Sequence, residues 1–313
     1  MLNVPSVNPS PQPEIRTLTS EDLDRIRLRR HFRLDIDEVR SILSVNCESS
    51  FWIPETDELI LVGIWRNRSD LMAIHGLAAT ANESALIEHA VEHARLRKMV
   101  ALLMVDAEET RRPVFYAKHG FRTIDKIATY ELAAQRQNAQ SILRDDLTFV
   151  RAAAADAVAK REVEHLDNLA FPWFWWNVRA ELDAYLSLPE VEVWIGLQNG
   201  AVASYFGITH YRGWGHLDRI ATHPDSQRDG IGAATLEAAI RRLRDHGATR
   251  IALSTQGENL PAQAMYERRG FERTLALDYT VFGYILNEAQ LKPMQVPERE
   301  VARGARTRTE REQ

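Results

Sequence analysis

A short pattern of residues occurs twice in this chain of 313 residues, once near the end of each half. The first copy occupies residues 114–121 and the second residues 264–271, and in each copy a Gly-Phe pair begins four residues after a tyrosine. The tyrosines, Tyr116 and Tyr266, lie 150 positions apart, and both Gly-Phe pairs keep that offset. Similarity at a fixed offset is typical of a duplicated structural unit. The sequence therefore predicts two copies of one domain.

The length agrees with this interpretation, because 313 residues suit two domains that each bury a core. The Pro-rich start of the chain and its end, which has charges of both signs and few large apolar residues, cannot form a core. We predict the following division: a flexible arm at 1–13, a first domain at 14–133, a linker at 134–146, a second domain at 147–290 and a disordered tail at 291–313.

Helix and strand signals alternate in the second half. Asn199-Gly200 is a type I′ turn signal between two β-rich runs, and Leu236, Ile240 and Leu243 have helical spacing before Gly247. These patterns predict an α/β fold with a mixed, mostly antiparallel sheet. We expect strands at 147–151, 191–198, 201–210, 215–223 and 250–255, helices near 154–169, 178–187, 230–246 and 260–269, and closing strands across 271–286.

A glycine-containing loop follows the strand that is expected to end near Thr222. Gly230 and Gly232 open the long helix, where small residues let a ligand approach the backbone. The free N–H groups of a first helical turn suit a phosphate group. By itself a Gly-x-Gly at this place is equally compatible with a tight turn from strand to helix.

Two motifs in a fixed order make the interpretation specific. Gln227, Gly230 and Gly232 match the acyl-CoA pyrophosphate loop of the GNAT acetyltransferase superfamily, Gln/Arg-x-x-Gly-x-Gly/Ala. Further along, the segment from Asn259 to Tyr266 resembles the Asn-x-x-Ala-x-x-x-Tyr helix of that family, and it too is followed by Gly-Phe. The resemblance implies two tandem GNAT-like domains, each with a mixed sheet flanked by helices, of which the second is catalytic.

The first half matches the family less completely. Tyr116 and the following Gly-Phe pair are present, but the loop near 80–85 contains no glycine, and Glu109 stands where the second copy has Asn259. The resemblance therefore implies that the first copy is degenerate and binds no cofactor.

The resemblance implies acetyl-CoA as a cosubstrate and no metal. Asp229 departs from the usual family pattern, because its carboxylate would weaken pyrophosphate binding unless it points to solvent; Arg228 could compensate. Arg268 and Arg269 could reach the nucleotide phosphates or could simply be surface residues. The residues expected to bind the cofactor are Ile220, Ala221, Thr222, Gln227, Arg228, Gly230, Ile231, Gly232, Ala233, Asn259 and Tyr266.

The family mechanism is direct attack of an amine on the thioester carbonyl in a ternary complex. Deprotonating an alkylammonium of pKa ~10 costs about 4 kcal/mol at neutral pH, so a base or a water chain is expected. By its position on the strand before the loop, Asp218 is the first candidate, with His216 as an alternative. Pairing of Asp218 with Arg219 or Arg250 is the competing structural interpretation.

Tyr266 matches the general acid that protonates the leaving thiolate in this family. A tyrosine in core packing is the alternative, since Tyr116 recurs in the degenerate copy. Asn259 and the glycine loop accompany Tyr266, which favours the catalytic role.

An aromatic stretch at 171–177 lies between the first two helices of the second half. Trp173, Trp175 and Trp176 are candidates for lining a pocket for an apolar or cationic amine. They could equally form a hydrophobic seam against the first domain.

The preferred function is an N-acetyltransferase that acts on a primary amine of a small molecule. The alternatives are an acyltransferase for protein lysines or N-termini, and a non-catalytic acyl-CoA-binding scaffold. A net charge of −5 provides no basic field for nucleic acid or an anionic membrane, and no apolar run is long enough to span a bilayer. Cys47 is the single cysteine, so we expect no intrachain disulfide. Met1 to Pro13 has no basic residue and no apolar core of signal-peptide length, so we expect a cytoplasmic protein.

Overall fold

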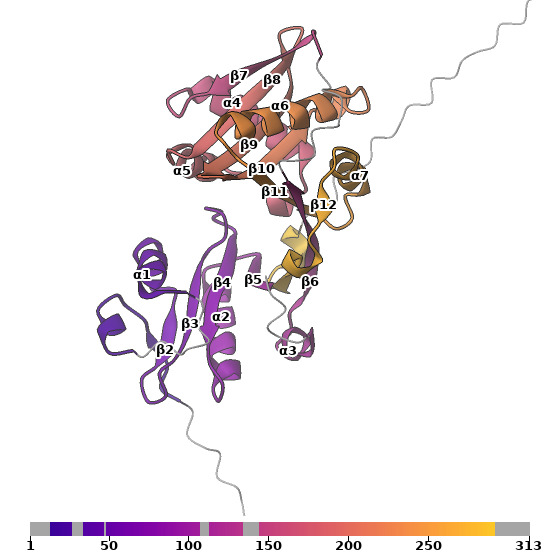
Figure 1. The fold of residues 1–313 in the computed structure, drawn as a ribbon. Coiled ribbons are helices and arrows are strands. Elements are labelled where there is room, and N and C mark those ends of the chain that lie inside the picture. Colours follow the sequence, from indigo (N-terminus) through magenta and orange to yellow (C-terminus); the bar gives the residue numbers. More distant parts are fainter. Residues whose placement is uncertain (1–12, 27–33, 47, 107–112, 134–143, 292–313) are drawn as a thin grey trace, which may run out of the picture.

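The structure is a computed structural model that describes residues 13–26, 34–46, 48–106, 113–133 and 144–291. Figure 1 shows two lobes, with the first half of the chain in indigo and purple and most of the second half in pink and orange. Thirteen strands form one mixed sheet that runs through both lobes. This α/β architecture with a mostly antiparallel sheet is the one that the sequence predicts.

The N-terminal half contains six strands, three α-helices and one short 3-10 turn among the described residues. In chain order these are β1 (Arg16–Thr17), η1 (Asp22–Asp24), α1 (Ile36–Val45), β2 (Phe51–Ile53), β3 (Glu58–Ile64), β4 (Leu71–Ala78), α2 (Glu83–Leu96), β5 (Ala101–Asp106), α3 (Pro113–Lys118) and β6 (Arg122–Ala133).

The C-terminal half repeats this order with additional short elements, and its strands and helices lie close to the predicted ranges. They are β7 (Leu147–Ala152), α4 (Ala157–Ala170), η2 (Trp173–Trp175), α5 (Arg179–Leu186), β8 (Val191–Gln198), β9 (Ala201–Tyr211), β10 (Trp214–Thr222), η3 (Pro224–Ser226), α6 (Ile231–Asp245), β11 (Arg250–Gln256), α7 (Leu260–Arg268), β12 (Glu272–Arg273), η4 (Leu275–Leu277), β13 (Tyr279–Ile285) and η5 (Glu288–Gln290).

The two halves exchange their last long strands. β13, from the end of the chain, pairs with β5 of the N-terminal half, and β6, from the N-terminal half, pairs with β11 of the C-terminal half. β13 and β6 also pair with each other, so the order across the junction is β5-β13-β6-β11. The division of the chain at 133 and 147 remains a prediction about sequence, because the sheet itself is continuous there.

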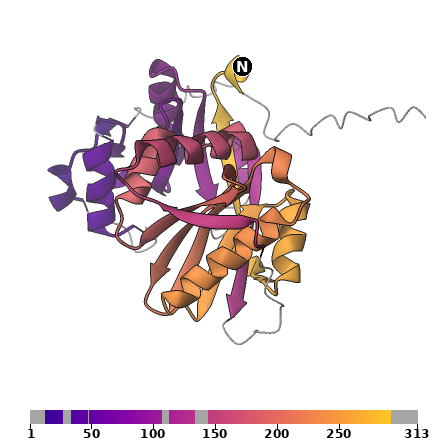
Figure 2. The same cartoon turned by 90° about the horizontal axis from the view of Figure 1, so that it is seen from above.

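Helices cover both faces of the C-terminal part of the sheet, and Figure 2 shows α4 and α6 on opposite sides of its strands. Neighbouring residues on β9 alternate between the faces, as a strand requires: Phe206 packs with α6, and Tyr205 packs with α4 and α5. α6 presents Leu236, Ile240 and Leu243 to its core, which is the stripe expected from the sequence.

Each half also contains a pair of parallel strands that separates part-way along. β10 and β11 pair from Trp214 to Leu217 and then diverge, and β4 and β5 pair from Leu71 to Ile74 and then diverge. In both cases the register against the preceding strand shifts at the next residue, Asp218 or His75. A bulge at this place bends the strand away from its parallel neighbour.

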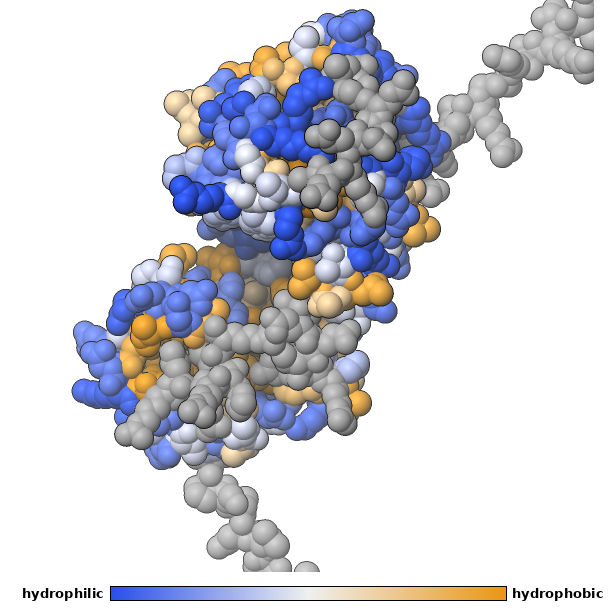
Figure 3. Space-filling model, in the orientation of Figure 1, coloured by the Kyte–Doolittle hydropathy of each residue, from blue (hydrophilic) through white to orange (hydrophobic). Residues whose placement is uncertain are grey.

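The space-filling view is hollowed between the two lobes (Figure 3). Among the described helices, none combines the length and the apolar character needed to cross a membrane. The predicted arm at 1–13 and tail at 291–313 lie outside the described residues except for one residue each, and most of the predicted linker lies outside them too.

Candidate active site

The separation of β10 and β11 opens a cavity of about 1010 Å³. Its walls include β10 from His216 to Thr222 and the facing part of β11, from Leu253 to Gln256. Beyond Leu217 the backbone of β10 still pairs with β9 but has no partner on β11, so its polar groups on the β11 side are available to a ligand. The cavity also receives side chains from α5, α7 and the N-terminal half.

The predicted pyrophosphate loop forms one end of this cavity. Gly230, with φ +78°, is the cap of α6, and Arg228 also has a left-handed φ of +66°. A side chain at Gly232 would place its Cβ 3.1 Å from Thr222 Oγ1. The loop therefore brings the first turn of α6 to the cavity wall with little side-chain cover, which suits an anionic ligand.

Nearly all residues predicted to bind the cofactor line the cavity. The exception is Ile231, which is buried against Leu147 and Ala203. The predicted residues on the wall are Ile220, Ala221, Thr222, Gln227, Arg228, Gly230, Gly232, Ala233, Asn259 and Tyr266.

The sequence suggested that Arg228 could compensate the carboxylate of Asp229, but in the structure Arg144 pairs with it. The carboxylate of Asp229 is 3.3 Å from Arg144 Nη2, and 64% of this aspartate side chain is exposed. Arg144, from the segment before β7, thus offsets the negative charge that Asp229 brings. Arg268 lines the cavity, whereas Arg269 is buried in an ion pair with Glu237 at 2.6 Å, so of these two only Arg268 is placed to meet phosphates.

α7 carries the tyrosine that the sequence singled out. Asn259 caps this helix by accepting a hydrogen bond from the N–H of Ala262 at 3.3 Å. Tyr266 is 4% exposed, packs against Tyr130 of β6 and lines the cavity. Burial, and secondly the neighbouring Tyr130, raise the pKa of Tyr266, so its hydroxyl holds its proton at neutral pH.

Asp218 is the bulged residue of β10 and lies where the strands separate. Its carboxylate accepts hydrogen bonds from Thr209 Oγ1 at 2.7 Å and from the hydroxyl of Tyr185, and its second oxygen is 2.7 Å from His216 Nδ1. The two arginines considered as structural partners are engaged elsewhere, Arg219 with Asp167 and Arg250 with Glu131. Asp218, His216 and Tyr185 all line the cavity, so the cluster faces the ligand space.

The aromatic stretch divides between two environments. Trp175 lines the cavity, and its indole N–H donates to Asp125 at 2.7 Å. Trp173 and Trp176 are not part of the lining. Trp173 instead packs in a cluster with residues of β4 and β5, under the guanidinium of Arg68 at 4.7 Å. Both environments considered from the sequence therefore occur, at different tryptophans.

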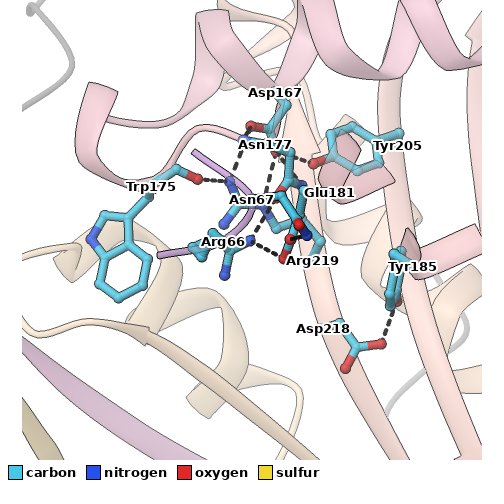
Figure 4. A network of polar contacts seen from close by, with 10 residues as sticks. All are labelled: Arg66, Asn67, Asp167, Trp175, Asn177, Glu181, Tyr185, Tyr205, Asp218 and Arg219. Atoms are coloured by element: carbon cyan, nitrogen blue, oxygen red, sulfur yellow. Dashed lines mark hydrogen bonds and ion pairs between the residues drawn. The ribbon is translucent and has the colours of Figure 1, made fainter. Parts of the chain in front are cut away.

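A buried polar network holds this stretch in place (Figure 4). Asp167 of α4 is fully buried and is 2.8 Å from Arg219 Nε, and it accepts the backbone N–H of Asn177 at 2.7 Å. Tyr205 donates to the same carboxylate, and Arg219 also donates to the carbonyl of Trp175. Hydrogen bonds around this buried carboxylate fix the segment that forms one wall of the cavity.

Four residues near the acceptor end were missed from the sequence: Arg66, Glu181, Tyr185 and Thr209. Arg66 comes from the turn between β3 and β4 of the N-terminal half, and the others come from α5 and β9. No local motif surrounds them. Only the alternation of β9 and the helical period of α5 could have placed Thr209 and Tyr185 on faces near β10.

The corresponding loop of the N-terminal half has another arrangement. Glu58, at the start of β3, is fully buried and accepts the backbone N–H groups of Thr80 and Ala81 at 2.6 and 2.8 Å, and that of Asn82 at 3.1 Å. These groups lead into the first turn of α2. In the N-terminal half, a carboxylate of the protein therefore binds the N–H groups before α2. The corresponding N–H groups of the C-terminal half, at the start of α6, face the cavity.

Comparison with known proteins identifies this arrangement. The sequence profile of the acetyltransferase (GNAT) family matches residues 155–271. These residues form a GNAT domain. It contains the loop, Asp218 and Tyr266, and part of the chain is similar to named N-acetyltransferases. The matched range ends before β13, the strand that the halves exchange.

Two curated relatives resemble part of the chain. A mycothiol acetyltransferase of Saccharomonospora viridis is 38% identical over 58 residues, which are 18% of this chain and 19% of that protein. The [ribosomal protein bS18]-alanine N-acetyltransferase of Escherichia coli K12 is 36% identical over 83 residues, 26% of this chain and 56% of that protein. The chain thus spans only a fifth to about half of the length of these relatives.

Two solved structures share the fold across both halves. A GCN5-related N-acetyltransferase from Sphaerobacter thermophilus has a TM-score of 0.63 at 12% identity, covering 90% of this chain and 98% of that one. A tandem GNAT protein from the clavulanic acid biosynthesis pathway has a TM-score of 0.59 at 14% identity, covering 87% and 98%. At these identities the likeness shows the tandem GNAT fold.

One group of described residues has the spacing of a metal site, away from the cavity. Glu192, His210 and His246 bring ligand atoms within 4.8 Å of one another. The carboxylate of Glu192 is already 2.7 Å from Arg242 Nε and 3.5 Å from Arg151 Nη1. Two guanidinium groups on one carboxylate disfavour a cation there. That the enzyme needs no metal remains a prediction.

Proposed function

We propose that the GNAT domain is an acetyl-CoA-dependent N-acyltransferase that moves an acetyl group to a primary amine of a small molecule by direct attack in a ternary complex. One observation carries this proposal: a single cavity joins the first turn of α6 to Asp218, with Tyr266 on its wall. The anion-binding end, the base and the acid thus meet the same space, as the reaction requires.

The cavity fits acetyl-CoA by its chemistry. The first turn of α6 offers backbone N–H groups to the pyrophosphate, and Arg228 and Arg268 add positive charge on the wall. The stretch of β10 at 220–222 pairs with β9 but not with β11, so on its β11 side it offers main-chain groups to the pantetheine and the thioester carbonyl. Arg144 keeps the Asp229 carboxylate from opposing the pyrophosphate.

The proposed reaction forms one bond and breaks another. The ammonium group of the acceptor first loses a proton to Asp218, directly or through His216, which is 2.7 Å from that carboxylate. The amine lone pair then attacks the thioester carbonyl carbon, the C–S bond breaks, and the sulfur leaves with its electron pair. Tyr266 gives its proton to that sulfur, and the second proton of the attacking nitrogen returns to the Tyr266 oxygen, so that neutral amide and free CoA are released while Asp218 passes its proton to solvent. The high pKa of Tyr266 means that this proton is present at neutral pH.

The N-terminal half supports the proposal as a structural partner. We infer that it is a degenerate copy that binds no acetyl-CoA, because Glu58 already satisfies the N–H groups before α2. It nevertheless reaches the acceptor end of the cavity through Arg66. Because the N-terminal half covers part of the acceptor end, the cavity suits a small acceptor better than an extended protein chain.

The experiment is thiol release from acetyl-CoA with a panel of small amines and of peptides with free N-termini or lysines. Wild-type turnover with small amines, and its loss in Asp218→Asn, would support the proposal. Turnover with peptides alone would favour a protein acceptor, in line with the ribosomal-protein relative. Failure with every amine, with acetyl-CoA still bound, would leave a non-catalytic acyl-CoA-binding scaffold. The cytoplasmic location and the absence of nucleic-acid partners remain predictions.

A further inference from the structure

Arg66 is a cation of the N-terminal half that faces the cavity of the GNAT domain. It lies in the tight turn between β3 and β4, where Arg66 and Asn67 both have left-handed φ values, +49° and +54°. Such values strain a residue that has a side chain, so the surrounding structure must hold the turn. The turn is tied to α5, because Asn67 donates to Glu181 at 2.7 Å.

The guanidinium of Arg66 is only partly satisfied by the protein. Nη2 donates to Asn177 at 2.5 Å, while the nearest carboxylate, Glu181, is 3.8 Å away and already accepts from Asn67. Nε is buried and has no hydrogen-bond partner among the residues that the structure describes. Arg68, two residues later, is the contrast: it holds Asp70 at 2.7 and 2.8 Å and the carbonyl of Trp173 at 2.5 Å.

Arg219, the other arginine at this end of the cavity, already has partners within the protein. Arg219 holds Asp167 with two nitrogens and the carbonyl of Trp175, and it lies 3.7 Å from the ring centre of Phe171. Burial, and secondly the charge of Arg219, lower the pKa of Arg66, but an arginine remains charged at neutral pH. The side chain of Arg66 is about three-quarters buried, with 26% of it exposed, and a cation in such a place is stabilised when an oxyanion binds it.

We propose that the acceptor carries, besides its amine, an acidic oxyanion, a carboxylate or a phosphate, which Arg66 binds. The proposal rests on the proposed function and deepens it: Asp218, on β10, receives the amine end, and Arg66, from the other half, receives the acidic end. Both residues line one cavity; in Figure 4 Arg66 is part of the network around Asp167, and Asp218 lies beside Tyr185. The N-terminal half thereby selects the acceptor.

The test uses matched primary amines of equal chain length that end in a carboxylate, a phosphate or a methyl group, with thiol release from acetyl-CoA as the readout. We expect kcat/KM for one of the acidic series to exceed that of the methyl series by about 10- to 100-fold, the range of a charge-assisted hydrogen bond. The preferred acid series identifies the source of the oxyanion.

The variant Arg66→Gln should erase this preference. It should lower kcat/KM for the acidic amines by about 10- to 100-fold and leave the methyl-ended amines unchanged. Arg66→Lys should retain part of the preference, and Arg40→Gln, on an exposed helix position, serves as the arginine control. Thermal unfolding and the Kd of acetyl-CoA, measured on each variant, separate a local effect from loss of the fold.

The outcomes for the two proposals are distinct. Wild-type turnover without any preference for acidic amines, or an equal loss for all series in Arg66→Gln, overturns the role of Arg66 and leaves the proposed function standing. If wild type turns over no amine, the proposed function fails. The role of Arg66 is then decided by calorimetry with the N-acetylated amines in the presence of CoA: equal affinity of the acidic and methyl-ended compounds overturns it.

Discussion

In the N-terminal half, the loop before α2 is closed by a carboxylate of the protein itself, whereas in the C-terminal half the first turn of α6 opens on a cavity. The two places correspond in the order of elements, and each follows a parallel strand that bends at a bulge. Glu58 supplies the anion in one half, and Gly230 and Gly232 leave room for one in the other. The fold thus preserves an anion-binding place even where no ligand is expected.

The two halves also differ in the residues at the strand bulges and on their last helices, and in both places it is the C-terminal residue that faces the cavity. Asp218 stands at the bulge of β10, with three side chains around its carboxylate, whereas His75 stands at the bulge of β4. Tyr266 lines the cavity, but Tyr116 lies stacked on Phe282 of β13, with ring centres 3.6 Å apart. One half keeps the geometry of a site, and the other fills the same positions with packing.

The largest expected effect concerns the two loops. Calorimetry should give one acetyl-CoA per chain, and Gly230→Glu or Gly232→Glu should weaken its Kd by at least about 100-fold, because the new carboxylate faces the pyrophosphate. Ala81→Glu, which puts the same charge in the loop before α2, should leave the Kd unchanged. Two equivalent sites, or tight binding by the glycine variants, would break the contrast between the halves.

The tyrosines give the next effect. Tyr266→Phe should lower kcat by about 10- to 10⁴-fold with the fold intact, because the leaving sulfur loses its proton donor. Tyr116→Phe should leave kcat almost unchanged. Steady-state rates and melting temperatures of both variants decide the point, and equal effects at the two positions would mean that the tyrosine is structural in each half.

The third effect concerns Trp173 and Trp175, the tryptophans that lie where the two halves meet. Trp173→Ala should reduce the free energy of unfolding by about 3–5 kcal/mol, because it leaves a cavity between the two lobes, with little change in the acceptor KM. Trp175→Ala should also lower the acceptor kcat/KM, since this residue lines the cavity. Acetyl-CoA affinity should change little in either variant. Stable variants with unaltered acceptor kinetics would contradict both assignments.

The smallest effect concerns Glu58. Burial alone would raise the pKa of this carboxyl, but the hydrogen bonds from 80–82 outweigh it and lower the pKa from 4.5 to about 2. The resulting stabilisation, about 2–3 kcal/mol, is fully present above pH 4.5 and disappears as the pH falls towards 2.

Glu58→Gln should therefore lower the free energy of unfolding at pH 7 by about 2–3 kcal/mol, and the gap to wild type should narrow below pH 4.5. Denaturant unfolding at several pH values measures both quantities, with exposed Glu55→Gln as the control. A gap that is independent of pH would show that the carboxylate charge is not what closes the loop.

Local patterns made much of the GNAT domain predictable. Gly230 and Asn259 cap α6 and α7, and Tyr266 lies on the same helix seven residues after Asn259, so short spacings along the chain carry the information. Asp218 was predicted to be the base only from its position on the strand before the loop. The bulge that turns it toward the cavity has no signal in the sequence. Its contacts with Tyr185 and Thr209 depend on separate elements and could not be predicted.

Long-range pairing explains the remaining gaps. The sequence indicates closing strands at 271–286 but not that β13 pairs with β5. The sequence of an apolar strand does not specify which strand it pairs with. Arg66 and Glu58 are ordinary charged residues in sequence, and their importance arises only when a distant loop or the other lobe meets them. The aromatic stretch was ambiguous for a similar reason: its residues face different elements.

The strand exchange has a consequence for the order in which the protein is made. During synthesis β5 emerges early, but its neighbour β13 is the last long strand, at Tyr279–Ile285. Until those residues leave the ribosome, an apolar edge containing Leu102, Leu103 and Met104 stays without its strand partner. A nascent chain halted before β13 is therefore exposed to edge-to-edge association, and the first lobe is completed only after residues 279–285 have been synthesised.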